Sequence, residues 1–331
     1  MGEDLRIGLV GCGRLAEIGY LPALRAARGV ALEAVAEPEP ARRARVAALA
    51  GRVPEFADAA ALLAGAEVDG LVLATPAPAH VPDARAAAAA GVAVLVEKPP
   101  AVDGRAAAEL AALTPAPWIG FNRRFDPGIT ALRSALGSAL GSALGSAPPA
   151  DGEVELLLEL AYRRPGWGAH TVNDDALLDL GPHLIDLARW LTRSEVSAVS
   201  HAALSPERAA FDLVLGRGRA RIHCATDRPH HELVEVRDRH GTVLGRHRRG
   251  GLLAALGGRL VPRRGPHPLV ASLVGQLEAF GRAVRGASEP ALGGAADGVS
   301  VMRTVDTVRL AYSAGSDLTG DLPTTVLTPE E

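Results

Sequence analysis

The chain has 331 residues, more than a single hydrophobic core usually organises, so its length predicts two domains. With 48% hydrophobic residues and a net charge of −3, the composition is that of a folded globular protein and excludes a disordered one. A pI near 6.4 indicates no excess of positive charge for binding nucleic acid or an anionic membrane. No apolar run reaches the length of a membrane span, so we expect neither nucleic acid nor a membrane as a partner.

Cysteine usage points to a reducing compartment. Cys12 and Cys224 are too few for a disulfide framework, and their spacing is not that of metal ligands. We therefore expect no metal site. The first four residues lead directly into an apolar run, which leaves no room for a signal peptide, so the sequence predicts a cytoplasmic protein.

The first predicted strand ends in a glycine-rich turn, Gly-Cys-Gly-Arg-Leu-Ala, at residues 11–16. Gly11 permits a tight turn out of the strand, and Gly13 allows the backbone to approach a pyrophosphate closely. Ala16 is small enough for the following helix to pack against the strand, and that helix directs its first N–H groups at the phosphates. The turn predicts a dinucleotide site, although a single such turn is weak evidence.

A second predicted strand, residues 30–36, ends at Glu37. An acidic side chain there can accept hydrogen bonds from the adenosine ribose and would repel a 2′-phosphate, which favours NAD over NADP. The alternative is a solvated acid within the sequence Glu-Pro-Glu-Pro. Because of Arg42 and Arg43, a phosphorylated cofactor, NADP, stays an alternative.

Strand and helix patterns then alternate, which predicts a parallel, doubly wound sheet with its ligands at the carboxyl ends of the strands. The predicted helices are 16–28, 41–50, 56–65, 82–90 and 104–113, and the later strands are 68–74, 92–96 and 118–121. The predicted ligand edge comprises Gly11, Glu37, Thr75, Glu97 to Pro99, and Gly120 to Arg124.

The pattern changes after a helix that starts near Pro127. Residues 134–147 contain a threefold Ser-Ala-Leu-Gly repeat, which predicts a flexible connector because glycine weakens every turn. Runs of strands follow and predict an α+β domain with an open antiparallel sheet. The predicted strands are 153–162, 196–203, 209–215, 220–225, 233–237 and 242–245, and the helices are 177–191, 268–285 and 299–314.

Lys98 is the first candidate catalytic residue. It follows a buried strand at the ligand edge, between Glu97 and two prolines that stiffen the backbone. A lysine held there can stabilise the alkoxide that develops as a hydroxyl carbon loses hydride. The alternative is an ordinary surface lysine, but the sequence contains no other lysine while arginine is abundant.

Asp179 and His183 form a second candidate constellation. They are four residues apart and share a helix face, whether Pro182 starts or kinks that helix. An acid beside a histidine fixes its tautomer and raises its basicity, which suits a general base. The alternative is a capping aspartate and a buried core histidine.

These motifs, in this order and spacing, resemble the Gfo/Idh/MocA family of nicotinamide-dependent oxidoreductases. The matching pieces are the residue 11–16 turn, Ala74-Thr-Pro with His80, Glu97-Lys-Pro, Gly120-Phe-Asn-Arg-Arg-Phe and Leu178-Asp-Leu-Gly-Pro-His. The resemblance implies a Rossmann domain at 1–121 and an α+β substrate-binding and oligomerisation domain at 122–331. The C-terminal segment would pack back on the first domain, and the large sheet of the second would form a homodimer or homotetramer.

The resemblance also implies roles for individual residues. Lys98, Asp179 and His183 would be catalytic, with His183 as acid/base oriented by Asp179. Tyr20 follows Gly19 where many members carry histidine, and it receives no role. NAD would be bound by Gly11, Cys12, Gly13, Arg14, Leu15, Glu37, Arg42, Thr75, Pro76, His80, Glu97, Lys98 and Asn122. A sugar-like substrate would meet Arg124, Tyr162, Trp167 and His170.

The reaction implied is interconversion of a secondary alcohol and a ketone on a sugar, aminosugar or cyclitol. Two alternatives stay open: a glycoside hydrolase or lyase that recycles bound NAD, and a non-catalytic NAD-binding regulator. The basic clusters at 246–249 and 263–264 could meet the phosphate of a nucleotide sugar. Solvated loops are the favoured reading because glycine surrounds these clusters and aromatic residues are missing.

Overall fold

The structure is a computed structural model that describes residues 3–139, 153–164, 174–250, 267–316 and 325–326. The chain divides into two compact units, Met1–Asp126 with Pro266–Val299, and Pro127–Gly265 with Ser300–Glu331. The first unit thus extends past the predicted boundary at residue 121 and takes in a distant C-terminal segment. None of the described helices is long and apolar enough to cross a lipid bilayer.

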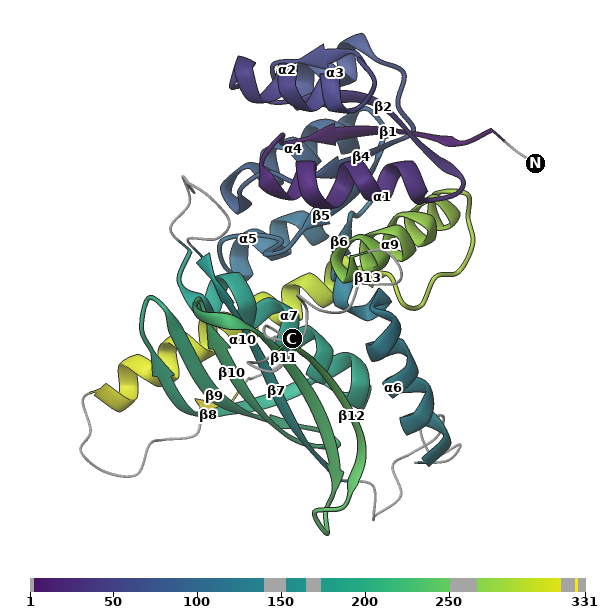
Figure 1. The fold of residues 1–331 in the computed structure, drawn as a ribbon. Helices are drawn as coiled ribbons and strands as arrows, with labels where there is room; N and C mark the ends of the chain where they lie inside the picture. The colour runs from purple at the N-terminus through teal and green to yellow at the C-terminus, as the bar shows by residue number, and fades with distance from the viewer. Residues whose placement is uncertain (1–2, 140–152, 165–173, 251–266, 317–324, 327–331) are drawn as a thin grey trace. The chain divides into compact units, whose positions relative to one another are not determined.

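Sheet A is the centre of the first unit, with the strand order β13–β6–β5–β4–β1–β2–β3 (Figure 1). Every neighbouring pair is parallel except β13 and β6. The chain winds outward from β1 in one direction and then returns to wind outward in the other, so the predicted doubly wound sheet is confirmed. The strands are β1 (Leu5–Val10), β2 (Val30–Ala36), β3 (Glu55–Phe56), β4 (Gly70–Leu73), β5 (Ala93–Glu97), β6 (Trp118–Gly120) and β13 (Gly293–Gly294).

Helices cover the parallel strands, as the connections between such strands require. They are η1 (Ala16–Tyr20, a π-helical turn), α1 (Leu21–Ala26), α2 (Pro40–Leu49), α3 (Ala59–Gly65), α4 (Ala77–Ala89), α5 (Gly104–Ala111), η2 (Asn122–Phe125, a 3₁₀ turn) and α9 (Pro268–Val284). Asp58 caps α3 by accepting from the Ala61 N–H at 2.7 Å, as its sequence position predicts.

Helix α9 belongs to the first unit because its apolar face completes that unit's core. Leu273, Leu277 and Phe280 lie in one buried cluster with Ile7 and Leu9 of β1. The ring of Phe280 also meets that of Trp118 edge-on, with 5.6 Å between the centroids. A helix far along the chain therefore fixes the position of the central strand.

Sheet B organises the second unit, with the strand order β12–β11–β7–β10–β9–β8–β14. Only β7 and β10 pair in parallel, so the predicted mainly antiparallel sheet is confirmed. The strands are β7 (Val154–Arg163), β8 (Val196–Leu204), β9 (Arg208–Leu215), β10 (Gly218–Ala225), β11 (Asp227–Asp238), β12 (Val243–Gly250) and β14 (Thr325–Val326).

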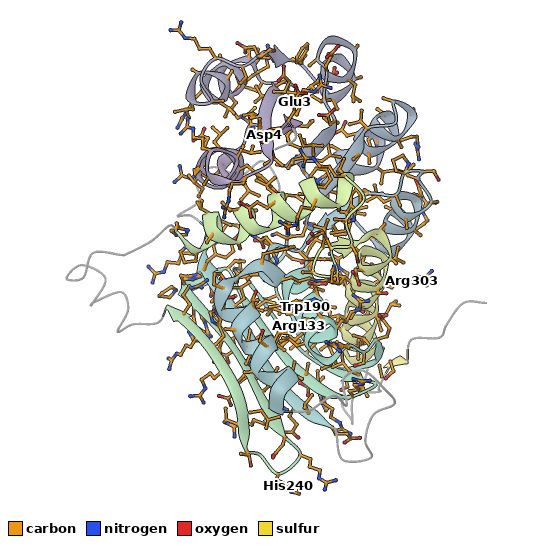
Figure 2. The ribbon with its side chains drawn as sticks, turned by 90° about the vertical axis from the view of Figure 1, so that its right-hand side faces the viewer. Glu3, Asp4, Arg133, Trp190, His240 and Arg303 are labelled. Carbon is orange, nitrogen blue, oxygen red and sulfur yellow. The ribbon has the colours of Figure 1, made fainter. Side chains whose placement is uncertain are left out.

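One face of sheet B is apolar and covered by helix α7 (Ala176–Thr192), which packs on β7, β9 and β10. Helix α6 (Pro127–Ala139) packs along β12, and Arg133 of α6 lies 3.7 Å from the Trp190 ring of α7 (Figure 2). The opposite face bears polar and charged side chains, including the ion pair of Arg221 with Asp212 at 3.1 Å. Helix α10 (Ala295–Ser316) divides between the two units at Val299.

Three expectations about the elements are wrong. Helix α4 begins at Ala77 rather than near Pro82, because Pro76 supplies the extended residue before it and Pro78 lies in its first turn, where no backbone N–H is needed. Pro82 lies inside the helix. Helix α6 continues to Ala139, into the predicted connector, since Leu136 extends its buried face beside Leu132. Residues 140–147 lie outside the described part of the chain.

The third correction concerns the basic cluster at 246–249. It is a strand rather than a solvated loop: these residues form β12, paired with β11. Arg246 forms an ion pair with Glu235, and Arg249 forms one with the buried Glu232 at 3.5 Å. The second cluster, 263–264, lies outside the described residues.

Candidate active site

The glycine-rich turn after β1 has the geometry expected of a phosphate-binding turn. Gly11 has φ +96°, and a Cβ there would lie 2.6 Å from the carbonyl oxygen of Ala74, so only glycine fits. A Cβ at Gly13 would meet nothing within 4 Å, which leaves the backbone open to a close approach. Arg14 is exposed, and Leu15 is half-buried against the core.

Glu37 follows β2, is hydrogen-bonded to this turn and is not a solvated acid. It is 7% exposed, and its carboxylate accepts the Cys12 N–H at 2.9 Å and the Glu39 N–H at 3.2 Å. Arg42 lies 3.8 Å from the same carboxylate. Glu39 is the acid that caps α2, by accepting from two N–H groups of its first turn. Burial and the charge of Glu37 raise the pKa of the Cys12 thiol to about 12, so this thiol stays protonated.

His80 hydrogen-bonds with the segments that follow β4 and β5. It is completely buried, with Nε2 2.8 Å from the carbonyl oxygen of Thr75 and Nδ1 3.1 Å from that of Pro100. A neutral imidazole donates to one of these carbonyls at a time. The histidine therefore links the loop after β4 to the turn that follows Lys98, while the buried Thr75 Oγ1 has no hydrogen-bond partner among the described residues.

We expect the protein to lose stability in mild acid through His80. Burial lowers its pKa to about 4, although the backbone carbonyls oppose the shift. Because the unfolded chain binds this proton near pH 6.5, the stability contributed by the neutral ring is present above that pH and is lost as pH falls towards 4. Between pH 7 and 5 the loss should be about 2 kcal/mol.

Urea unfolding of the wild type and of His80→Asn at both pH values measures this contribution. The free energy of unfolding of the wild type should fall by about 2 kcal/mol more than that of the variant. Equal pH dependence in the two proteins would show that His80 does not titrate as described.

Glu97 and Lys98 end β5 at the carboxyl edge of sheet A. Glu97 is 4% exposed, accepts the Tyr20 hydroxyl and folds back to accept the backbone N–H of Lys98 at 3.0 Å. Burial raises the pKa of Glu97, an effect opposed by the Tyr20 hydrogen bond and the Lys98 charge. The half-buried Lys98 thus follows a buried carboxylate that holds its main chain.

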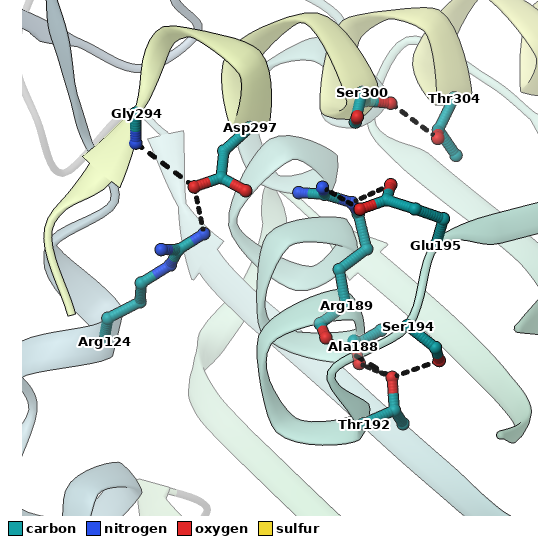
Figure 3. A network of polar contacts seen from close by, with 10 residues as sticks. All are labelled: Arg124, Ala188, Arg189, Thr192, Ser194, Glu195, Gly294, Asp297, Ser300 and Thr304. Atoms are coloured by element: carbon teal, nitrogen blue, oxygen red, sulfur yellow. Dashed lines mark hydrogen bonds and ion pairs between the residues drawn. The ribbon is translucent and has the colours of Figure 1, made fainter. Parts of the chain in front are cut away.

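Asn122 and Arg124 follow β6 in the turn η2. The Asn122 side chain is buried, and its Oδ1 has no hydrogen-bond partner among the described residues. Arg124 has a structural position that sequence reasoning did not anticipate. It is 4% exposed, lies over the Phe121 ring and pairs with Asp297 at 3.1 Å (Figure 3). These contacts hold the Arg124 side chain within the first unit.

In the second unit, Asp179 lies one turn inside α7. Its carboxylate accepts the Tyr162 hydroxyl and an N–H of Arg164 at 3.1 Å. Burial and the charge of Asp179 raise the pKa of Tyr162, so the phenol stays protonated and donates. Sequence reasoning placed Tyr162 in the site but missed Arg164, which no local motif marks.

His183 is buried one helical turn after Asp179, and α7 runs continuously through Pro182. Asp175 precedes the first residue of the helix, accepts the Leu178 N–H at 2.7 Å and lies 3.4 Å from Arg309. Asp175 is therefore the N-cap of α7. Trp167 and His170 lie outside the described residues.

Within the first unit, the structure brings the predicted cofactor residues to one edge of sheet A, since they follow β1, β2, β4, β5 and β6. In the second unit it brings together Tyr162 and Asp179. Among the described residues, no group of three or more histidine, cysteine or acidic side chains could hold a metal ion.

Comparisons with known proteins identify relatives. Residues 5–116 match a family model described as an oxidoreductase family with an NAD-binding Rossmann fold. Inositol 2-dehydrogenase 4 of Saccharopolyspora erythraea is 33% identical over 203 residues, 60% of this chain and 57% of the relative. The rhizopine catabolism protein MocA of Rhizobium meliloti is 31% identical over 57% of this chain and 58% of its own. The chain thus spans less than two thirds of the length of these relatives.

Solved structures share the fold over almost the whole chain. Scyllo-inositol dehydrogenase from Lactobacillus casei, solved with NAD(H) and scyllo-inositol, has a TM-score of 0.76 at 18% identity and covers 95% of this chain and 98% of its own. The WlbA dehydrogenase from Bordetella pertussis, solved with NADH and UDP-GlcNAcA, has a TM-score of 0.75 at 18% identity, with 99% and 100% covered. At this identity the likeness establishes the fold.

Proposed function

We propose that the chain is a member of the Gfo/Idh/MocA family of NAD-binding oxidoreductases and that it is an NAD-dependent dehydrogenase acting on a secondary alcohol of a cyclitol or sugar. The observation that supports this most is the position of Lys98. It follows β5 on the same sheet edge as the glycine-rich turn and Glu37. In a doubly wound sheet that edge is where ligands bind.

The residues at this edge fit a dinucleotide. The open backbone at Gly13 would receive the pyrophosphate, and Glu37 would face the adenosine ribose. Thr75 Oγ1 and Asn122 Oδ1 are buried and have no hydrogen-bond partner within the part of the chain that the structure describes, and a bound ligand would supply one. When bound, NAD would accept a hydride from the substrate carbon.

Side chains of the protein would stabilise the negative charge on the substrate oxygen and accept the proton of the substrate hydroxyl. Lys98 would donate a hydrogen bond to the substrate oxygen as alkoxide character develops there. His183 would take the hydroxyl proton, with Asp179 as its orienting acid. Asp179 is itself held by Tyr162 and Arg164, so its carboxylate is kept in one orientation.

The substrate is tested by following NADH formation with the purified protein and a panel of cyclitols, free sugars, aminoglycosides and nucleotide sugars. We expect NADH to accumulate with an inositol, because the relatives at 33% and 31% identity include inositol 2-dehydrogenases. Cleavage of a glycoside without net NADH would instead support the cofactor-recycling alternative. Binding of NAD with no turnover of any compound would support a regulatory protein.

Replacing Glu37 should change the choice of cofactor. In Glu37→Ser the Cys12 N–H loses its acceptor and the repulsion of a 2′-phosphate disappears, while Arg42 remains nearby. We expect kcat/KM for NAD to fall about tenfold and the NADP/NAD ratio to rise by a similar factor, about 1.4 kcal/mol each. Steady-state kinetics with both cofactors measure this. Glu33→Ser on the same strand is the control and should leave the ratio unchanged.

We further propose that the first unit binds the dinucleotide and that the second binds substrate and forms a cytoplasmic homodimer or homotetramer through sheet B. On the face of that sheet away from α7, Leu157 and Leu233 are partly exposed among polar and charged side chains, which supports an interface. Light scattering of the purified protein measures the assembly, and a monomer at micromolar concentration would contradict it.

A further inference from the structure

A chain of buried hydrogen bonds leads from helix α9 to the main chain of Lys98. The Gln276 Nε2 group donates to the Tyr20 hydroxyl oxygen at 3.4 Å, and the hydroxyl donates to Glu97 Oε1 at 2.5 Å. Tyr20 and Gln276 have no exposed surface. These residues come from η1, α9 and the end of β5, so the chain connects three elements of the first unit.

The two oxygens of Glu97 face different partners. Oε1 accepts from Tyr20, and Oε2 accepts the backbone N–H of Lys98 at 3.0 Å. One carboxylate oxygen therefore accepts a hydrogen bond from a core side chain, and the other accepts one from the main chain of the candidate catalytic lysine. Gln276 polarises the Tyr20 hydroxyl and strengthens its hydrogen bond to Glu97 Oε1. That bond fixes the carboxylate and therefore the direction in which Oε2 accepts the Lys98 N–H.

Packing allows this carboxylate little freedom. A Cβ at Gly120 of the neighbouring β6 would lie 3.2 Å from the Glu97 Cα and 3.3 Å from its carboxyl carbon. The Tyr20 ring lies in the apolar cluster with Leu273 and Leu277 of α9. The ring is fixed by the core independently of its hydroxyl, so the hydroxyl itself needs another explanation.

We propose that Tyr20, supported by Gln276, is a positioning residue that fixes the Glu97 carboxylate and thereby the backbone of Lys98. This inference rests on the proposed role of Lys98 in the reaction. Tyr20 would act only through Glu97, without contacting the substrate. A phenylalanine would fill the same core space but would leave Glu97 Oε1 buried without its donor.

Removing the hydroxyl should slow the reaction more than it weakens binding. We expect kcat of Tyr20→Phe to fall about 10- to 100-fold, because a small displacement of a catalytic group is costly, while KM for NAD stays close to wild type. The melting temperature should fall by a few degrees, because a buried acceptor loses its donor. Tyr312, which is 41% exposed, provides the matched control, and Tyr312→Phe should leave kcat unchanged.

A double-mutant cycle tests whether Tyr20 acts through Glu97. If it does, Tyr20→Phe combined with Glu97→Gln will be about as slow as Glu97→Gln alone, because the two changes break one linkage. The pH profile adds a readout that packing would not change. The Tyr20 hydrogen bond opposes the raised pKa of Glu97, so its loss should raise that pKa further. Protonation of Glu97 should then add a second acid limb to the kcat profile of Tyr20→Phe, separate from the limb expected for His183.

The outcomes separate this inference from the proposed function. Wild-type kcat and pH profile in a folded Tyr20→Phe protein, with Lys98→Met inactive, would overturn the role of Tyr20 and leave the dehydrogenase intact. Full turnover in Lys98→Met would instead overturn the role of Lys98 on which both rest. Should Tyr20→Phe not fold, Glu97→Gln is measured in its place, and wild-type kcat in that variant would overturn the inference.

Discussion

Lys98→Met should still bind NAD and should turn over substrate about 10²- to 10³-fold more slowly. Methionine keeps the length and the apolar stem of the side chain but cannot donate to the developing alkoxide, and loss of one such donor costs about 3–4 kcal/mol in the transition state. Cofactor fluorescence titration measures binding, and steady-state kinetics measure kcat. Undiminished turnover would show that the charge is stabilised by another group.

Two controls sharpen this experiment. Arg105→Met removes a cation from an 88% exposed side chain on α5, where kcat should not change. Lys98 is also the only lysine in the sequence, so amine-directed acetylation modifies only this side chain and the N-terminal amine. Acetylation should inactivate the wild type but should not further slow Lys98→Met. Equal loss in both proteins would assign the inactivation to the N-terminus.

The first βαβ unit could be predicted because its signals are local. An apolar run followed by Gly11 and Gly13 specifies a strand, a turn and a helix start within a dozen residues, and the structure has all three. Strand β13 could not be predicted, because its two glycines, Gly293 and Gly294, have no strand propensity of their own. They join sheet A only because folding brings them beside β6.

The same contrast applies to the site. The position of Lys98 at a strand end is readable from the sequence, but its neighbours depend on contacts made by distant residues. Arg124 is neutralised by Asp297, and Tyr20 is held by Gln276, which lies 256 residues away. Glu37 looks exposed within Glu-Pro-Glu-Pro, yet it is buried by the turn whose N–H it accepts. Such pairings follow from tertiary packing, which local propensity does not encode.

The second large effect is expected at His183. His183→Asn should lower kcat about 10²- to 10⁴-fold, the range that general acid–base catalysis contributes, with little change in NAD affinity. In the direction of alcohol oxidation the wild-type rate should rise with pH as the histidine loses its proton, and the variant should lose this limb. The rate measured across pH with the same substrate tests this, and a retained limb in the variant would place the base elsewhere.

Two further variants distinguish a base from a packing residue. His240→Asn removes an imidazole from the exposed turn between β11 and β12 and should leave the profile unchanged (Figure 2). Asp179→Asn keeps the shape of the carboxylate that Tyr162 and Arg164 hold but removes its charge. If Asp179 orients His183 and supports its basicity, this variant should slow turnover and displace the pH limb without abolishing it. If His183 only fills the core, its own substitution should lower the melting temperature and leave the limb where it is.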